Sequence, residues 1–121
     1  MPALKIDERI SVGDIQKEFN SIFPFLKIEF FKTAINQADG NSYKTTSLLT
    51  STDKIGKSTK TIDVTSSTTV AQLKTILKNT LGITSLIYRR SGSMWIETSL
   101  TEDWTLERQN HEAEQMSSNS I

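Results

Sequence analysis

The sequence of 121 residues predicts an α+β fold, in which a mixed β-sheet of four to five strands carries helices packed on one face. Two segments have apolar residues at helical spacing, and several others alternate apolar and polar residues. The order strand–helix–strand occurs twice, over residues 3–32 and 61–90. Each helix has one apolar stripe and each strand one apolar face, so these surfaces are expected to bury one another.

The first unit begins with a short strand and a capped helix. Leu4 and Ile6 alternate with polar residues, which predicts a strand over residues 3–6. Ser11 suits the N-cap of the next helix, and Asp14 follows where a carboxylate stabilises the positive helix end. The apolar residues of this helix recur at helical spacing: Val12, Ile15, Phe19 and Ile22. The helix is expected to end before the proline that follows it.

From residue 25 to residue 32 the apolar period becomes two, which predicts a second strand. One face carries Leu26, Ile28 and Phe30, and the other carries Lys27, Glu29 and Phe31. Residues 33–60 are rich in Asn, Ser, Thr and Lys and contain Gly40 and Gly56. We expect a mobile loop there, with a loosely paired strand around residues 43–50.

The second unit repeats the order of the first. Ile62 and Val64 alternate with polar residues, and Thr69 and Gln72 form a capping box. The helical stripe consists of Val70, Leu73, Leu77 and Leu81. Gly82 then suits the left-handed conformation that ends many helices.

The remaining residues predict a hairpin and a last helix. Residues 85–90 and 94–98 both read as strands, and a Ser-Gly turn joins them. Thr101 can cap a helix of undefined length. We therefore predict one domain over residues 1–112 and a polar C-terminal tail over residues 113–121.

The two units align with an offset of 58 residues, which pairs the caps Ser11 and Thr69 and superimposes the first three members of the two helical stripes. At the same offset the second strands match as two pairs: Ile28 with Leu86, and Phe30 with Tyr88. We interpret the repeat as two units that converge on one architecture, with right-handed crossovers.

Residues 61–110 carry three segments with a family pattern. The stretch TIDVTSSTTVAQLKTILKNTLGI reads as a strand, a short link, a capped helix and a closing glycine and isoleucine. LIYRRSGSMW follows as a strand and hairpin, and TEDWTLERQN as an acidic turn with a Thr-Leu pair that opens a helical turn. Together they resemble the ubiquitin-like β-grasp family, which implies a β-grasp-like sheet. The chain lacks the terminal glycine pair of conjugated members, so covalent tagging is not implied.

The chain departs from that pattern in two places. Residues 33–60 separate two strands that the family joins by a tight hairpin. The family's closing central strand would follow residue 110, where HEAEQMSSNSI is a poor strand, and residues 3–6 are the candidate for that slot. A ferredoxin-like fold, which is built from two strand–helix–strand halves, is the alternative that explains the repeat directly.

Composition narrows the classes of function. There is no cysteine, which excludes disulfides, thiolate nucleophiles and cysteine-based metal sites. Fourteen basic and fourteen acidic residues cancel, whereas duplex-binding proteins usually carry a net basic face. No apolar run is long enough for a signal peptide or a membrane span, so we expect a cytoplasmic protein.

Two motifs that suggest catalysis or phosphate binding have plainer interpretations. His111 is followed by two glutamates, but the segment is polar and a catalytic zinc needs about three rigidly held protein ligands. IGKST at residues 55–59 lacks the glycine that a phosphate-binding loop has five positions before Gly56, where Ser51 stands. We therefore predict no catalytic residue, no metal site and no cofactor.

Phe31 and Trp95 are the candidate binding residues. By alternation both lie on the sheet face opposite the apolar one, which no predicted helix needs to cover. Aromatic residues are enriched in protein interfaces. The alternative is that the N-terminal segment, the long loop or the last helix covers this face. The leading hypothesis is a non-enzymatic interaction module that binds a protein partner or a second copy of the chain.

A basic rim is the second candidate site. Lys32, Arg89 and Arg90 end the two units. Together with four lysines of the predicted loop they would form a basic rim: Lys44, Lys54, Lys57 and Lys60. Such a rim would contact phosphates, which makes nucleic-acid binding the second hypothesis. A third hypothesis is a small enzyme, or a subunit that completes another enzyme's site, for which the sequence selects no residues.

Overall fold

The computed structural model of the chain describes residues 3–38, 40–56 and 60–118. Along these residues the elements are β1 (Ala3–Ile6), α1 (Val12–Ile22), β2 (Leu26–Ala38), β3 (Asn41–Leu48), β4 (Lys60–Asp63), α2 (Val70–Leu81), β5 (Thr84–Ser91), β6 (Met94–Glu97), a 3-10 turn (Ser99–Thr101) and α3 (Leu106–Ser118). The predicted α+β class is confirmed. No helix in the described ranges is long and apolar enough to cross a membrane.

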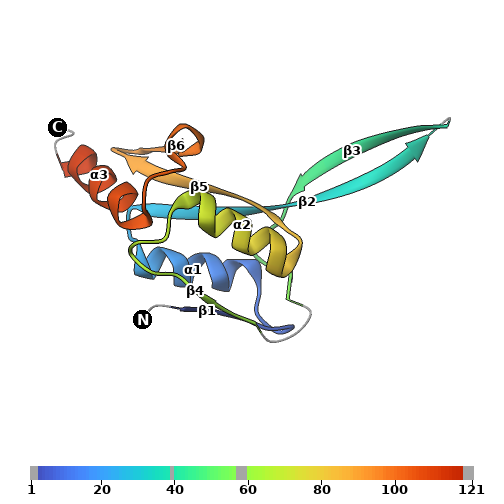
Figure 1. Cartoon of the computed structure of the whole chain (residues 1–121), viewed down its shortest axis with the longest axis horizontal. Helices are drawn as coiled ribbons and strands as arrows, with labels where there is room; N and C mark the ends of the chain where they lie inside the picture. The colour runs from blue at the N-terminus through green and yellow to red at the C-terminus, as the bar shows by residue number, and fades with distance from the viewer. Residues whose placement is uncertain (1–2, 39, 57–59, 119–121) are drawn as a thin grey trace.

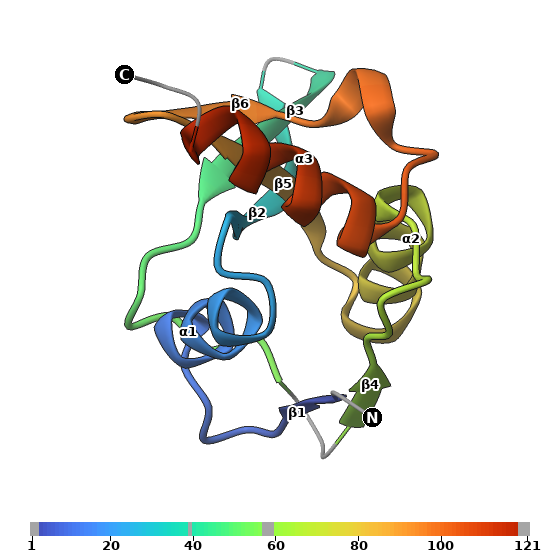
Figure 2. The same ribbon diagram turned by 90° about the vertical axis from the view of Figure 1, so that its left-hand side faces the viewer.

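The strands divide into two sheets, where the sequence predicted a single mixed sheet. β1 pairs with β4, and the other strands follow the order β3-β2-β5-β6, with each named pair antiparallel. The first strands of the two units thus pair with each other, and so do the second strands. Figure 2 shows the sheets on opposite sides of the body with α1 and α2 between them. Periodicity shows which face of a strand is buried but not which strand lies beside it.

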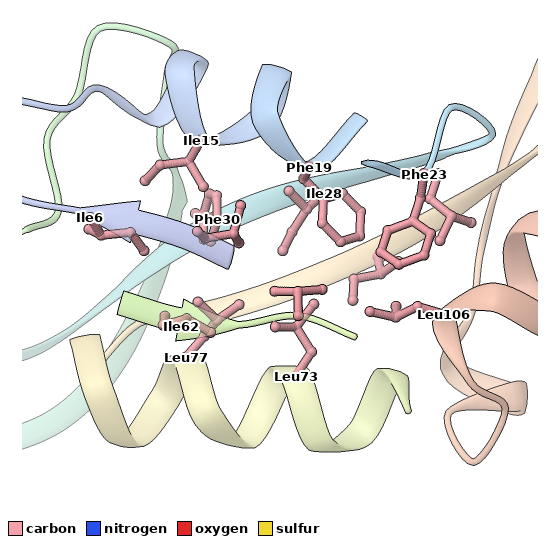
Figure 3. Packing of buried hydrophobic residues seen from close by; sticks show 14 of the residues in the cluster. Ile6, Ile15, Phe19, Phe23, Ile28, Phe30, Ile62, Leu73, Leu77 and Leu106 are labelled. Atoms are coloured by element: carbon pink, nitrogen blue, oxygen red, sulfur yellow. The ribbon is translucent and has the colours of Figure 1, made fainter. Parts of the chain in front are cut away.

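One core fills the space between the sheets and helices. Phe19 of α1 and Phe30 of β2 are fully buried, as are Leu73 and Leu77 of α2, and Figure 3 shows them in one cluster. Burying one such side chain contributes about 1.5–3 kcal/mol. As predicted, α1 and α2 cover the same face of the four-stranded sheet, and β1 and β4 close the core from the far side (Figure 1).

Both helices begin at the predicted N-caps, and both N-caps belong to capping boxes. The Ser11 hydroxyl accepts a hydrogen bond from the Asp14 amide at 3.2 Å, and Thr69 does the same for Gln72 at 3.1 Å. Gly82 ends α2 with a φ of 66°, a conformation that glycine adopts without steric cost. These local features follow from neighbouring residues, which is why the sequence predicts them well.

The repeat extends beyond each strand–helix–strand unit to a closing turn. The first amide of α1, Val12, donates to the carbonyl of Asp53 at 2.7 Å, and that of α2, Val70, donates to Trp104 at 3.2 Å. The next amide of each helix donates to a carbonyl two residues before the first acceptor. Gly13 donates to Ser51 at 3.0 Å, and Ala71 donates to Glu102 at 2.9 Å. Each helix N-terminus is therefore satisfied by the turn after its own unit's second hairpin strand.

The two units differ in length at their hairpins. Isolated β-bridges join Ser11 to Lys54 and Thr69 to Thr105, which are equivalent pairs. The first pair spans 43 positions (54 − 11) and the second 36 (105 − 69), so the first unit is seven residues longer. The difference lies in the β2–β3 hairpin, which projects from the body (Figure 1).

The predicted match of the second strands is wrong by one residue. Ile28 lies directly opposite Ile87, 59 positions away, and both side chains are buried. Leu86 and Tyr88 lie on the opposite face, so they are not the counterparts of Ile28 and Phe30. Because side chains alternate with a period of two, a slip of one residue moves every side chain to the other face.

Most of the segment predicted as a loop is strand. Residues 33–38 complete β2, and β3 covers Asn41–Leu48 in a register that runs from Phe31 opposite Leu48 to Ala38 opposite Asn41. The strand expected around residues 43–50 is therefore displaced by two residues. Both faces of this hairpin are solvated where side chains are described, so no apolar alternation signals it. Residues 57–59 lie outside the described residues.

Much of the predicted polar tail belongs to α3. Ala113 is fully buried, and the helix continues to Ser118, whereas residues 119–121 lie outside the described residues. Leu106 and Gln109 complete the buried stripe of the helix. The Gln109 amide donates to the Thr101 carbonyl at 2.8 Å and to its hydroxyl at 2.7 Å. The apolar pattern of the sequence did not reveal this stripe because a polar residue, Gln109, lies between Leu106 and Ala113.

The structure predicts that Gly56→Ala destabilises the protein. A Cβ at this position would lie 2.2 Å from the carbonyl oxygen of Asp7, so the backbone would have to move. We expect a loss of about 2 kcal/mol or more in the free energy of unfolding, measured by urea denaturation. Ser93→Ala, at an exposed turn position, is the control and should change it by less than about 0.5 kcal/mol. Equal midpoints for the two variants would contradict the packing of Gly56 on Asp7.

A second prediction concerns the anchoring of α3. Gln109→Ala removes two hydrogen bonds to Thr101 and should cost about 1–3 kcal/mol, because it leaves buried polar groups without partners. Gln115→Ala is the matched control in the same helix, since Gln115 is exposed and should be nearly neutral. Thermal melts of both variants test this, and a neutral Gln109→Ala would show that α3 docks without it.

Candidate functional site

The open face is the surface of the four-stranded sheet that points away from the helices. Its members are Lys27, Glu29 and Phe31 of β2, Leu48 of β3, Leu86, Tyr88 and Arg90 of β5, and Trp95 and Glu97 of β6. The register places Tyr88 opposite Lys27, and Trp95 opposite Arg90, and directly paired residues share a face. In the described part of the chain, the three helices all pack on the other face, where Ile28 and Ile87 are buried. Phe31 and Trp95 therefore lie where their alternation predicted.

Trp95 lies at the centre of a group of charged and aromatic side chains. The Lys27 ammonium is 5.1 Å from the Trp95 ring centroid and 5.1 Å from that of Tyr88. The same ammonium is 3.4 Å from a carboxylate oxygen of Glu29. The Arg90 guanidinium carbon lies 6.0 Å from the Trp95 ring. Cation–π contacts of this kind contribute about 0.5–1 kcal/mol each when exposed, so together they restrict the indole orientation.

Tyr88 is held in its neutral form. Partial burial raises the pKa of its phenol, and the nearby carboxylates of Glu29 and Glu97 and a hydrogen bond to Glu29 act in the same direction. A phenolate would be poorly solvated and would face two negative charges. Tyr88 thus offers a hydroxyl and a ring face to a ligand at neutral pH.

Phe31 belongs to a separate part of the open face. It lies opposite Thr84 of β5 and Leu48 of β3, and Leu48 is 54% exposed. Trp95 lies opposite Arg90, six residues further along β5. At about 3.3 Å per residue this separates the two aromatics by about 20 Å along the strand. The two predicted binding residues therefore share a face but not a single contact area.

The β6 edge adds apolar surface next to Trp95. Met94 and Ile96 lie on the other side of this strand and are 68% and 37% exposed, and Leu100 of the following 3-10 turn is 99% exposed. β6 pairs with β5 alone among the described strands, so its outer edge is available. Single exposed apolar residues are common, but a group of them around an edge strand beside a tryptophan is typical of a binding surface. Sequence analysis singled out only Trp95 on this strand and so missed this group.

The structure does not bring the predicted basic rim together. Lys32 is exposed on the projecting hairpin, whereas Arg90 is on the open face and donates to the Gly92 carbonyl at 2.8 Å. Arg89 faces α3, donates to Gln109 at 3.2 Å and lies 5.5 Å from the Trp104 ring. Of the neighbouring lysines, Lys44, Lys54 and Lys60 are exposed. Lys57 lies outside the described residues. Adjacent residues of a strand point to opposite faces, which separates the two arginines.

The other motifs have structural roles. Asp14 lines a depression of about 660 Å³ between β1 and α1, but its carboxylate accepts hydrogen bonds from the Ser11 hydroxyl and amide. These bonds lower the pKa of Asp14 and commit it to capping α1. His111 is exposed on α3. Across residues 3–38, 40–56 and 60–118, no three His, Cys, Asp or Glu side chains gather closely enough to hold a metal ion.

Sequence reasoning missed Lys27, Glu29 and Tyr88 as partners of Trp95. The alternation of β2 correctly placed Lys27 and Glu29 beside Phe31, but nothing in the sequence showed that β2 pairs with β5. The offset of 58 also put Tyr88 on the buried face. An odd offset between the second strands would have placed Tyr88 correctly.

Comparisons of the chain with protein-family models, with curated protein sequences and with solved structures gave no match. The local elements expected from the resemblance of residues 61–110 are present, including β4, the capped α2 and the β5–β6 hairpin. The relationship to ubiquitin-like proteins itself stays a prediction.

Proposed function

We propose that the protein is a non-enzymatic interaction module that binds a protein partner through the open face around Trp95 and the adjoining β6 edge. The observation that carries this proposal is the half-buried Trp95, held by Lys27, which also contacts Tyr88, on a sheet face that the helices leave uncovered. The cysteine-free composition suits a reducing compartment, so the cytoplasm is the proposed location.

The residue types at this surface favour a protein ligand. Tryptophan, tyrosine and arginine are the residues most enriched among those that dominate binding energy, and Trp95, Tyr88 and Arg90 lie together here. Their orientation is already restricted by the cation–π contacts and by the Lys27–Glu29 ion pair. A surface that is ordered before binding loses less conformational entropy on binding.

The charges of the surface are balanced. Lys27 pairs with Glu29, and Arg90 and Glu97 lie on the same face of the neighbouring strands. A balanced and partly apolar surface favours a partner with apolar side chains and mixed charges over a polyanion. Nucleic-acid binding has less support, because Lys32, Arg89 and Arg90 do not form one surface. Lys32 lies on the projecting hairpin, Arg89 faces α3, and Arg90 lies on the open face.

The test is a capture experiment with nuclease-treated lysate, followed by titration of each captured protein after purification. Trp95→Ala should weaken binding of the purified partner by tenfold or more, about 1.4 kcal/mol or more, because it removes the central side chain. Met116→Ala is the control, since Met116 is 41% exposed on α3 and away from the open face. Equal affinities of the two variants for every purified partner would contradict the proposal. Capture that is lost with nuclease would favour nucleic acid instead.

Lys27 gives an independent prediction as a positioning residue. Lys27→Met removes the cation between Trp95 and Tyr88 and should reduce the affinity several-fold, whereas Lys27→Arg should keep most of it. Isothermal titration with the same purified partner measures both. A uniform loss in both variants would mean that Lys27 contacts the partner itself through its ammonium, and unchanged affinity in both would exclude a role.

A further inference from the structure

The projecting hairpin has an unpaired strand edge. β5 pairs with β2 from Leu26 to Phe31 only, so residues 33–38 pair only with β3. We call residues 32–38 and 41–47 the arm. Seven residues at about 3.3 Å each make it about 23 Å long. Figure 1 shows the arm extending away from the helices and from the rest of the sheet.

The unpaired edge lacks the features that usually protect such edges. Residues 33–38 read TAINQA, with no charged residue and no proline. Within residues 3–38, 40–56 and 60–118, no strand pairs with this stretch on the side away from β3. Natural edge strands are usually short or carry charges, prolines or bulges that prevent pairing with another chain. The β3 side of the arm differs, because Lys44 interrupts it.

The arm is an addition that the core does not require. The second unit closes its helix cap in the same way, with seven residues fewer between the cap and the closing bridge. The described side chains of the arm are exposed and contribute nothing to the core: Lys32, Thr33, Asn41, Ser42, Lys44, Thr46 and Ser47. A two-stranded hairpin is only marginally stable in water, so a third strand would stabilise it.

The same edge of a second copy fits this position. A partner strand beside residues 33–38 would continue the line of β5, which runs antiparallel to β2. A two-fold axis through Ile35 makes the two copies antiparallel and places Thr33 opposite Gln37, and Ala34 opposite Asn36. The five positions 33–37 then pair with the same five of the second copy, no like charges meet, and the two bodies lie at opposite ends of the joined arms.

We propose that the arm is a self-association element, through which two copies of the chain join edge to edge into a ribbon of strand order β3-β2-β2-β3. Five paired residues from each copy form an interface well below the standard size of about 1,600 Å². The dimer should therefore be weak, with a dissociation constant of about 1 μM or above.

Sedimentation velocity of the full chain, from about 5 to about 500 μM, tests the proposal across that range of affinity. The wild type should pass from a 13.6 kDa species to one of twice that mass. The double variant Ala34→Lys/Asn36→Lys places lysines opposite each other across the axis and should stay monomeric, and so should Ala34→Glu/Asn36→Glu. An equimolar mixture of the two should dimerise, because each lysine then faces a glutamate.

Three controls separate this edge from other surfaces. Ser42→Lys/Thr46→Lys adds the same charges to β3 and should associate like the wild type. Replacing residues 33–46 with Asn-Gly joins the hydrogen-bonded pair Lys32 and Ser47 by a two-residue turn and should abolish association while keeping the thermal stability of the core. Trp95→Ala should dimerise normally, which distinguishes this site from the open face. A monomeric wild type, an associating lysine variant, or a mixture that stays monomeric would overturn the proposal.

Discussion

Neither half of this protein can bury its own apolar surface, and the fold depends on that constraint. Each unit places its two strands in different sheets and its helix between them, so the apolar stripe of one helix meets residues of the other unit. Phe19 and Phe30 of the first unit share one cluster with Leu73 and Leu77 of the second. The two units are therefore expected to fold as one cooperative domain rather than in sequence.

The approximate two-fold relation between the units extends to the turns that close the helix N-termini. Val12 and Val70 donate to equivalent carbonyls, and the two isolated bridges occupy equivalent positions. The units differ mainly on the outside: the first has the longer hairpin, and the second is followed by α3. Surfaces that the shared core does not constrain are free to carry binding functions, and both proposed interaction sites lie on such surfaces.

The two sites have different physical characters. Trp95 and its neighbours form a side-chain surface, restricted by cation–π contacts and an ion pair, and suited to recognise a particular partner. The arm offers main-chain donors and acceptors, which pair with any strand of suitable direction. Its only selectivity is that no like charges meet when two copies pair. Because about 20 Å or more separates them along the sheet, one copy can use both at once.

The sequence by itself determined the local elements and the faces they bury. Capping boxes at Ser11 and Thr69, the left-handed Gly82 and the outward placement of Phe31 and Trp95 all follow from neighbouring residues or from a period of two. Only the tertiary structure decided the division into two sheets, the register that joins Tyr88 to Lys27 and the helical state of residues 113–118. These depend on contacts between residues far apart in the chain, which periodicity does not encode. The arm was missed for a related reason, since its described side chains are exposed on both faces and leave no apolar alternation to detect.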